Sequence, residues 1–239
     1  MGARQPTRAY PAPRPQRSWV AKERVPRRLV FIVDDDAHLR RAVWYLLEST
    51  GYVPRVFASG EDLLAELEYL PPAPMLIDLH MPGLDGLHLL GEVKQRIPII
   101  PVVMMSGHGD IECAVKAMKL GAQDFVEKPF ADERLLAAVA TATAALTQAM
   151  EHEEDLLYAT RRIAELSARE AEVLAGLAAG QSNKVIAFTL GLSIRTVEMH
   201  RVRMMRRLAV RTLSEALRLA HLAGLEAGNA RPGKQGSER

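Results

Sequence analysis

The sequence has little of what disulfides, thiolate metal clusters or membrane spans require. Its single cysteine, Cys113, excludes an intrachain disulfide and a cysteine-ligated metal cluster. No apolar run reaches the roughly 20 residues that cross a bilayer, and no apolar segment follows the first basic residues as in a secretory signal. These absences favour a protein of the reducing cytoplasm, with no membrane partner. Aromatic residues make up 5% of the 239-residue chain, so aliphatic side chains and alanine are expected to fill its cores.

Charge of both signs is abundant but segregated, although the net charge is only +2. Residues 1–28 carry eight Lys/Arg, one acid and five prolines without an apolar period, which predicts a disordered basic extension. It is either a basic arm that contacts DNA phosphates or, as we favour, a solvated tail or the result of a start codon assigned too far upstream. Residues 29–150 carry nine basic and seventeen acidic residues, whereas residues 161–221 carry eleven and five. Acidic sites suit cations, and compact basic domains suit nucleic acid.

From Leu29 onward, short apolar strands alternate with helices. The expected strands are Leu29–Val33, Val53–Phe57, Met75–Leu79, Pro98–Met105 and Asp124–Val126. The expected helices are Ala37–Ser49, Gly60–Glu68, Gly86–Gln95, Ile111–Leu120 and one that begins at Asp132. Five such units predict an α/β fold, a doubly wound (βα)5 parallel sheet. Ligands of such folds bind beyond the carboxyl ends of the strands.

The last part of the chain is predicted to be entirely helical. The helix from Asp132 meets no breaker before Ser167, so it is expected to continue into a helical linker. Four capped helices should follow, and the signals for them are the capping boxes Ser167/Glu170 and Thr212/Glu215, the stops Gly180 and Gly224, and the segments Asn183–Leu190 and Ser193–Leu208. A short helix, the turn Gly191-Leu192-Ser193 and a longer basic helix form a helix-turn-helix pattern.

Polar residues follow the predicted strands at the edge where a ligand would bind. Asp34–Asp36 end the first strand, Asp78 lies near the end of the third, Ser106 ends the fourth and Lys128 follows the fifth. Carboxylates converging in one crevice repel one another unless a cation is present. Oxygen ligands without cysteine fit Mg²⁺ best. A carboxylate nucleophile, a metal and a cationic clamp predict phosphoryl transfer.

Residues 29–130 resemble the receiver domain of response regulators. The matching motifs are Ile32-Val33-Asp34-Asp35-Asp36, Asp78-Leu79-His80-Met81-Pro82-Gly83-Leu84-Asp85-Gly86, Ser106-Gly107-His108-Gly109-Asp110 and Phe125-Val126-Glu127-Lys128-Pro129-Phe130. The resemblance implies that Asp78 accepts a phosphoryl group from a sensor histidine kinase. It also implies that Asp35, Asp78 and the backbone carbonyl of His80 bind Mg²⁺ directly, with Asp34 acting through water.

The same resemblance gives roles to three further residues. It implies that Lys128 pairs with Asp78 or its phosphate, that Ser106 hydrogen-bonds a phosphate oxygen, and that Phe125 is the aromatic partner of the switch. It also implies a cis bond between Lys128 and Pro129.

Plainer interpretations exist for many of these residues. Asp36, Asp85 and Asp110 are expected to be helix N-caps. Ser106 could be a turn residue, Phe125 a core residue and Lys128 a solvated lysine, although pairing with three carboxylates argues against the last. His80, His88 and His108 lack the spacing of a transition-metal site, and Cys113 is most simply a small buried side chain.

The third C-terminal helix has two faces. One carries Val197, Met204 and Leu208, and the other carries Arg195, Glu198, Met199, Val202 and Arg206. The first can pack on the neighbouring helices while the second enters a major groove, with arginines at its margins reaching phosphates. The alternative is a surface helix with solvated arginines.

Residues 167–224 resemble the LuxR-type helix-turn-helix of FixJ/NarL-class regulators. The matching segments are Leu166 to Leu174, Gly180 to Ala187 and Leu190 to Arg201. The resemblance implies that Glu198, Met199 and Val202 face bases and that Lys184, Thr196 and Arg203 contact the backbone. A glutamate with two apolar side chains permits contact with cytosine amino or thymine methyl groups. A Walker glycine loop is missing from the sequence, which argues against the ATP-driven activator class.

The expected organisation has five parts. They are a basic extension (1–28), a receiver (29–150), a helical linker (151–166), a LuxR-type DNA-binding domain (167–224) and a tail (225–239). The expected function is not enzymatic but that of a phosphorylation-dependent transcription regulator, with a sensor kinase, promoter double-stranded DNA, RNA polymerase and a second copy of the chain as partners. The alternatives are a constitutive DNA-binding module, which the intact acidic site disfavours, and a phosphate sink, which the helix-turn-helix disfavours.

Overall fold

The computed structural model describes residues 28–107 and 111–225. The expectations for residues 1–27, His108, Asp110 and the tail beyond residue 225 lie outside the described residues. The chain divides into two compact units between Leu146 and Thr147, and each is described by itself.

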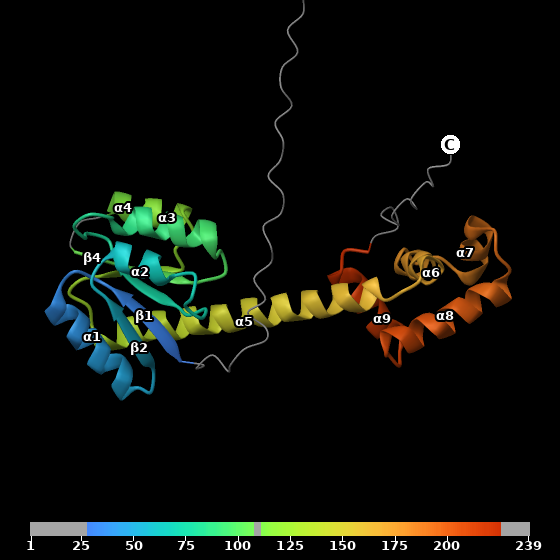
Figure 1. Cartoon of the computed structure of the whole chain (residues 1–239), viewed down its shortest axis with the longest axis horizontal. Helices are drawn as coiled ribbons and strands as arrows, with labels where there is room; N and C mark the ends of the chain where they lie inside the picture. The colour runs from blue at the N-terminus through green and yellow to red at the C-terminus, as the bar shows by residue number, and fades with distance from the viewer. Residues whose placement is uncertain (1–27, 108–110, 226–239) are drawn as a thin grey trace, which may run out of the picture. The chain divides into compact units, whose positions relative to one another are not determined.

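The first unit is built on a parallel sheet of five strands in the order β2-β1-β3-β4-β5 (Figure 1). The strands are β1 (Leu29–Val33), β2 (Val53–Phe57), β3 (Met75–Asp78), β4 (Val102–Ser106) and β5 (Asp124–Glu127). Every strand pairing is parallel, from β1 with β2 through to β4 with β5. The prediction of a doubly wound parallel sheet is confirmed.

Helices cover both faces of this sheet (Figure 1). One face is covered by α2 (Gly60–Glu66), α3 (Gly86–Arg96) and α4 (Ile111–Lys119), and the other by α1 (Ala37–Ser49) and the first part of α5 (Asp132–Ala164). Strand β1 shows the alternation, because Phe31 and Val33 enter the core on the α2–α4 side while Val30 and Ile32 enter the other core. Burial on both faces explains why the strands are almost continuously apolar.

Strand β4 differs from its prediction. It begins at Val102 instead of Pro98, and the segment before it is a turn. Pro98 and Pro101 have no N–H to donate to a sheet, and Lys94 donates from Nζ to the carbonyl of Ile100 at 2.7 Å. The apolar Ile99–Ile100 pair extended the predicted strand too far. The ends of α2, β3, α3, α4 and β5 also differ from prediction, by one or two residues.

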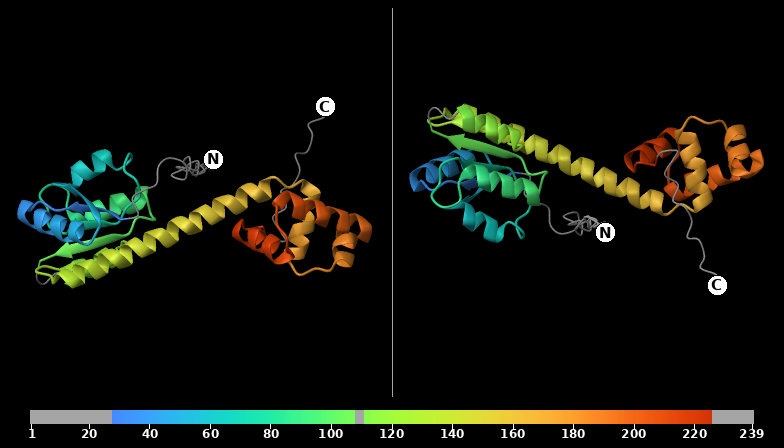
Figure 2. Two further views of the ribbon diagram at one scale, coloured as in Figure 1. Left: turned by 90° about the horizontal axis from the view of Figure 1, so that it is seen from below. Right: turned by 90° about the horizontal axis from the view of Figure 1, so that it is seen from above.

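The second unit is helical (Figure 2). After α5 come α6 (Ala168–Ala178), α7 (Asn183–Leu190), α8 (Ile194–Leu208) and α9 (Leu213–Leu222). The Ser167/Glu170 capping box is present, Ser193 caps α8, and Gly191 closes α7 with a φ of +63°. The helix-turn-helix prediction is therefore confirmed residue by residue.

The end of α5 belongs to the core of the helical unit. Ala159 is fully buried among residues of α6 to α9, and Ile163 and Leu166 pack against the same cluster. The second half of the expected linker is thus part of a hydrophobic core. Among the residues that the structure describes, no helix combines the length and apolar character needed to cross a membrane.

Candidate functional site

Three carboxylates gather at the carboxyl end of the sheet. Asp34 follows β1 and is fully buried, Asp78 ends β3 with 6% of its surface exposed, and Asp35 is exposed. One carboxylate oxygen from each lies within 4.8 Å of the others. The loops after neighbouring parallel strands meet at this edge, which is why residues 43 positions apart become neighbours.

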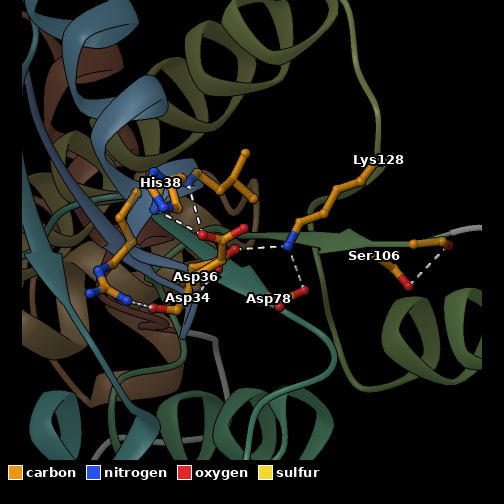
Figure 3. Close-up of polar contacts among 9 residues, drawn as sticks. Asp34, Asp36, His38, Asp78, Ser106 and Lys128 are labelled. Carbon is orange, nitrogen blue, oxygen red and sulfur yellow. Dashed lines mark hydrogen bonds and ion pairs between the residues drawn. The ribbon is translucent and has the colours of Figure 1, made fainter.

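Lys128 bridges two of these carboxylates. Its Nζ lies 2.8 Å from Asp34 Oδ2 and 2.9 Å from Asp78 Oδ1 (Figure 3). Burial raises the pKa of the Asp78 carboxyl above its usual value, and the hydrogen bond and charge of Lys128 oppose this only in part. Burial alone would lower the pKa of Lys128, but the hydrogen bonds and charges of Asp34 and Asp78 raise it overall. The site therefore holds a charged ammonium between two buried carboxylates.

The backbone around Asp34 fixes its orientation. Asp34 Oδ1 accepts the N–H of Asp36 at 2.8 Å, and its carbonyl accepts Nη1 of Arg40 at 2.5 Å. Asp36 accepts the N–H of His38 at 2.8 Å and caps α1, as predicted. Both carboxylate oxygens of Asp34 thus have protein partners, which leaves Asp35 as the exposed carboxylate of the three.

Ser106 ends β4 and Phe125 lies in β5, and the two side chains differ in their surroundings. Ser106 is fully buried at the end of β4, and its hydroxyl donates to the carbonyl of Gly107 at 3.3 Å (Figure 3). Phe125 is partly buried and packs against the core on the α2–α4 side. The peptide bond between Lys128 and Pro129 is cis.

Gly86 is a site residue for which sequence reasoning had no role beyond a helix start. A Cβ at this position would lie 2.1 Å from the Asp78 carbonyl oxygen, so only glycine allows α3 to begin so close to β3. Asp85 caps the same helix by accepting the His88 N–H at 2.8 Å, as predicted. The glycine in the Asp85-Gly86 pair was the available signal, but one sequence cannot show how close the backbones come.

The donor set of this edge fits Mg²⁺. The three clustered side chains offer carboxylate oxygens, which hard cations prefer. Three carboxylates facing one ammonium also leave excess negative charge that a divalent cation would neutralise. No such cluster of three His, Cys, Asp or Glu ligands occurs elsewhere in the described part of the chain.

The second unit presents an exposed face on α8. Val197, Met204 and Leu208 are buried, whereas Arg195, Glu198, Met199, Val202, Arg203 and Arg206 are exposed, as predicted. Lys184 is exposed on α7, and Thr196 shares a 2.8 Å hydrogen bond with the Ser193 hydroxyl at the helix start. An exposed helix face with arginines at its margins suits a major groove.

Other polar contacts of α8 are structural. Arg201 donates to Asn183 Oδ1 at 2.8 Å and ties α8 to α7. Arg207 pairs with the buried Glu170 at 2.9 Å. Sequence reasoning missed both contacts, because their partners lie 18 and 37 positions away in the chain.

Comparisons with known proteins agree with this geometry. Residues 30–140 match the family described as response regulator receiver domain, and residues 164–220 match bacterial regulatory proteins of the luxR family. The transcriptional regulatory protein FixJ of Bradyrhizobium diazoefficiens is 41% identical over 196 residues, which cover 82% of this chain and 96% of that protein. The chain belongs to the FixJ group of two-component response regulators.

Further members of this group match over a similar length. The C4-dicarboxylate transport transcriptional regulatory protein DctR of Rhodobacter capsulatus is 40% identical over 80% of this chain and 98% of its own length. The crystal structure of full-length FixJ from B. japonicum covers 82% of this chain and 97% of its own, with 41% identity and a TM-score of 0.53. The response regulator StyR covers 81% and 98%, with 32% identity and a TM-score of 0.71.

Membership of the FixJ group establishes the broad function. FixJ-type response regulators join a receiver to a LuxR-type domain and act as transcriptional regulators, not as typical enzymes. The receiver implies a sensor kinase as partner, and the LuxR-type domain implies DNA binding. Receiver domains generally bind Mg²⁺ at an acidic pocket, which corresponds here to the cluster of Asp34, Asp35 and Asp78.

Proposed function

We propose that Asp78 of this response regulator is the phosphoacceptor and that its phosphorylation controls promoter binding. The observation that carries the proposal is the Lys128 ammonium held between Asp34 and Asp78 at the ligand-binding edge of the sheet. Asp78 ends β3 with its carboxylate in this crevice, and only 6% of the residue surface is exposed. A carboxylate so placed has a cationic partner ready for the charge of an incoming phosphoryl group.

Asp35, Asp78 and the backbone carbonyl of His80 would hold Mg²⁺ directly, and Asp34 would act through water. When bound, Mg²⁺ supplies charge neutralisation for the phosphoryl oxygens. The secondary role of Asp34 is supported by its two carboxylate oxygens, which already accept from Asp36 and Lys128. The exposure of Asp35 supports its direct role.

In the transfer step, a carboxylate oxygen of Asp78 attacks phosphorus. A carboxyl O–P bond forms while the P–N bond of the phosphohistidine on the sensor kinase breaks, and the imidazole leaves. Lys128 holds the aspartate and then the phosphoryl oxygens. Ser106 would turn its hydroxyl from the Gly107 carbonyl towards a phosphoryl oxygen, and Phe125 would follow that change as the aromatic residue of the switch.

On the DNA side, we assign the exposed face of α8 to the major groove. Glu198, Met199 and Val202 would face base edges, while Lys184, Thr196 and Arg203 would contact the phosphate backbone. The proposed assembly is a homodimer formed on phosphorylation, acting on promoter double-stranded DNA with RNA polymerase in the cytoplasm. We retain a receiver at 29–150 and a DNA-binding domain at 167–224, joined by a helical linker at 151–166 whose end packs into the core of the helical unit.

The test is phosphorylation by acetyl phosphate and Mg²⁺, followed by intact mass. The wild-type chain should gain one phosphoryl group. Asp78→Asn should not be phosphorylated at the wild-type rate, because the nucleophile is lost. Asp62→Asn, an exposed aspartate of α2, is the matched control and should behave as wild type. Unchanged phosphorylation of Asp78→Asn would show that another residue is the acceptor. Genome-wide DNA occupancy of wild type and Asp78→Asn then tests whether phosphorylation controls binding.

A further inference from the structure

A side chain of α2 holds the loop between β3 and α3, residues 79–85. Glu61, in the first turn of α2, accepts the backbone N–H of Leu84 at 2.9 Å through Oε1. The two residues are 23 positions apart, so this bond joins separate elements of the fold. A hydrogen bond from a backbone N–H to a charged carboxylate is among the stronger ones in proteins.

Two glycines make room for this anchor. Gly83 has a φ of +78°, and a Cβ on it would lie 2.6 Å from Glu61 Oε1. Gly60, next to Glu61, has Leu84 against it, with Leu84 Cδ2 at 3.1 Å from a Cβ placed there. The loop and the start of α2 therefore pack so closely that Gly83 cannot carry a side chain without displacing Glu61.

The anchored loop begins at the phosphorylation site. Asp78 precedes it directly, and its second residue is His80, whose backbone carbonyl we assign to Mg²⁺. The ends of the loop are fixed by backbone hydrogen bonds, Leu79 N–H to Met105 at 2.8 Å and Gly86 N–H to Leu79 at 3.0 Å. Between these ends, the His80 N–H donates to the Asp78 carboxylate. The Glu61 bond restrains the backbone that runs on from His80 to Leu84.

We propose that Glu61 is a positioning residue for the phosphorylation site. By holding Leu84 it restrains the backbone that carries the His80 carbonyl, and so strengthens Mg²⁺ binding and speeds phosphorylation. Its own carboxylate is engaged by the loop and is no metal ligand in this arrangement. The inference rests on the proposed function and adds to it a residue from α2, outside the strand-end motifs.

The experiment compares three variants of the full chain by Mg²⁺ titration calorimetry and by the rate of phosphorylation with acetyl phosphate. Glu61→Ala removes the acceptor and should weaken Mg²⁺ binding about tenfold, at the low end for a residue that orients a metal ligand. Glu61→Gln keeps an acceptor oxygen and should stay within about twofold of wild type. Glu66→Ala removes an equal charge from the same helix, where Glu66 pairs with Arg55 and not with the loop, and should leave binding unchanged.

A fourth variant changes the contact from the loop side. Gly83→Ala places a Cβ against Glu61 in a strained backbone and should weaken Mg²⁺ binding as Glu61→Ala does. Thermal unfolding without Mg²⁺ should show that all four variants are folded, because a loss of fold would lower affinity for another reason.

Two outcomes would overturn the inference alone. One is equal Mg²⁺ affinity in wild type and Glu61→Ala, and the other is an equal loss in Glu61→Gln or Glu66→Ala, which would assign the effect to charge and not to the hydrogen bond. A wild-type chain that binds no Mg²⁺ would instead overturn the proposed function, and this inference with it.

Discussion

Gly86 packs its Cα against the backbone of Asp78, where an added Cβ would lie 2.1 Å from the carbonyl oxygen. We predict that Gly86→Ala destabilises the chain by about 1–3 kcal/mol, as overpacking in a core does. It should also slow phosphorylation, because the clash is with Asp78, the proposed phosphoacceptor. Urea unfolding and the acetyl phosphate assay measure the two effects.

The matched control for this variant lies in the same helix. A Cβ on Gly91 would meet nothing within 4 Å, so Gly91→Ala should stabilise α3 by about 0.5–1 kcal/mol through helix propensity. Equal stabilities of the two alanine variants would show that the contact at Gly86 is not restrictive.

Glu170 is a buried carboxylate of the helical unit with an acid-dependent contribution to stability. Burial alone would raise its pKa, but hydrogen bonds from Ser167 and the charges of Arg207 and His200 lower the pKa below its usual value of 4.5. The stabilisation is therefore complete above about pH 4.5 and is lost as pH falls through the lower pKa of the folded state.

We predict that Glu170→Gln costs about 1.5–3 kcal/mol at pH 7, as expected for hydrogen bonds to a charged group. The difference from wild type should shrink as the pH falls below 4.5, because the wild-type carboxylate then becomes protonated. Unfolding by urea across this pH range is the measurement. A difference that stays constant with pH would mean that the ionised form of Glu170 is not the stabilising one.

Single residues also show which parts of the site can be predicted from sequence. Asp34, Asp78 and Lys128 were placed together because each follows or ends a predicted strand, and parallel strands bring such residues to one edge. Glu61 and Gly86 were not recognised, because their importance lies in distances to backbone atoms that no local pattern encodes.

The ends of helices and strands were also predicted correctly where neighbouring residues determine them, and wrongly where residues distant in the sequence do. The Ser167 cap, the Gly191 stop and the Ser193 cap were predicted correctly, since capping depends on residues within one turn. The start of β4 was predicted wrongly because the apolar Ile99–Ile100 pair continues the apolar run of the strand. In the structure this pair lies in a turn, and Lys94 of α3 donates to the Ile100 carbonyl.

The element that can be tested most directly is α8, whose exposed face has two expected tasks. Arg203→Ala removes a proposed phosphate contact, so it should weaken specific and scrambled duplexes alike and reduce the salt slope by about one. Glu198→Ala and Val202→Ala remove proposed base contacts, so each should cost about 1–3 kcal/mol on the specific duplex only. Binding at several salt concentrations measures both effects. If Glu198→Ala and Val202→Ala weaken both duplexes equally, this face does not read sequence.

At the scale of the whole molecule, the receiver has an exposed apolar surface on α4. Ile111, Val115 and Met118 are 78%, 48% and 50% exposed, and their spacing places them along one face of α4. Such a surface suits association with a second copy. A dimer matters for a DNA-binding protein, because joining two small domains raises affinity for paired half-sites through effective concentration.

We predict that the phosphate mimic beryllofluoride, with Mg²⁺, converts the chain from monomer to dimer in the micromolar range. Asp78 and α4 lie in the same domain, so a change at Asp78 can be transmitted to this face of α4 by the packing around Phe125.

Val115→Glu should block the dimer, because an isologous interface would bring two buried charges together. Tyr69 lies between α2 and β3, and 85% of its surface is exposed. Tyr69→Glu therefore places the same charge on another exposed hydrophobic residue, and this variant should dimerise as wild type does. Sedimentation is the measurement, with intact mass confirming that both variants still accept a phosphoryl group. A wild-type chain that stays monomeric with beryllofluoride would contradict dimerisation on phosphorylation, and a Val115→Glu chain that still dimerises would move the interface away from α4.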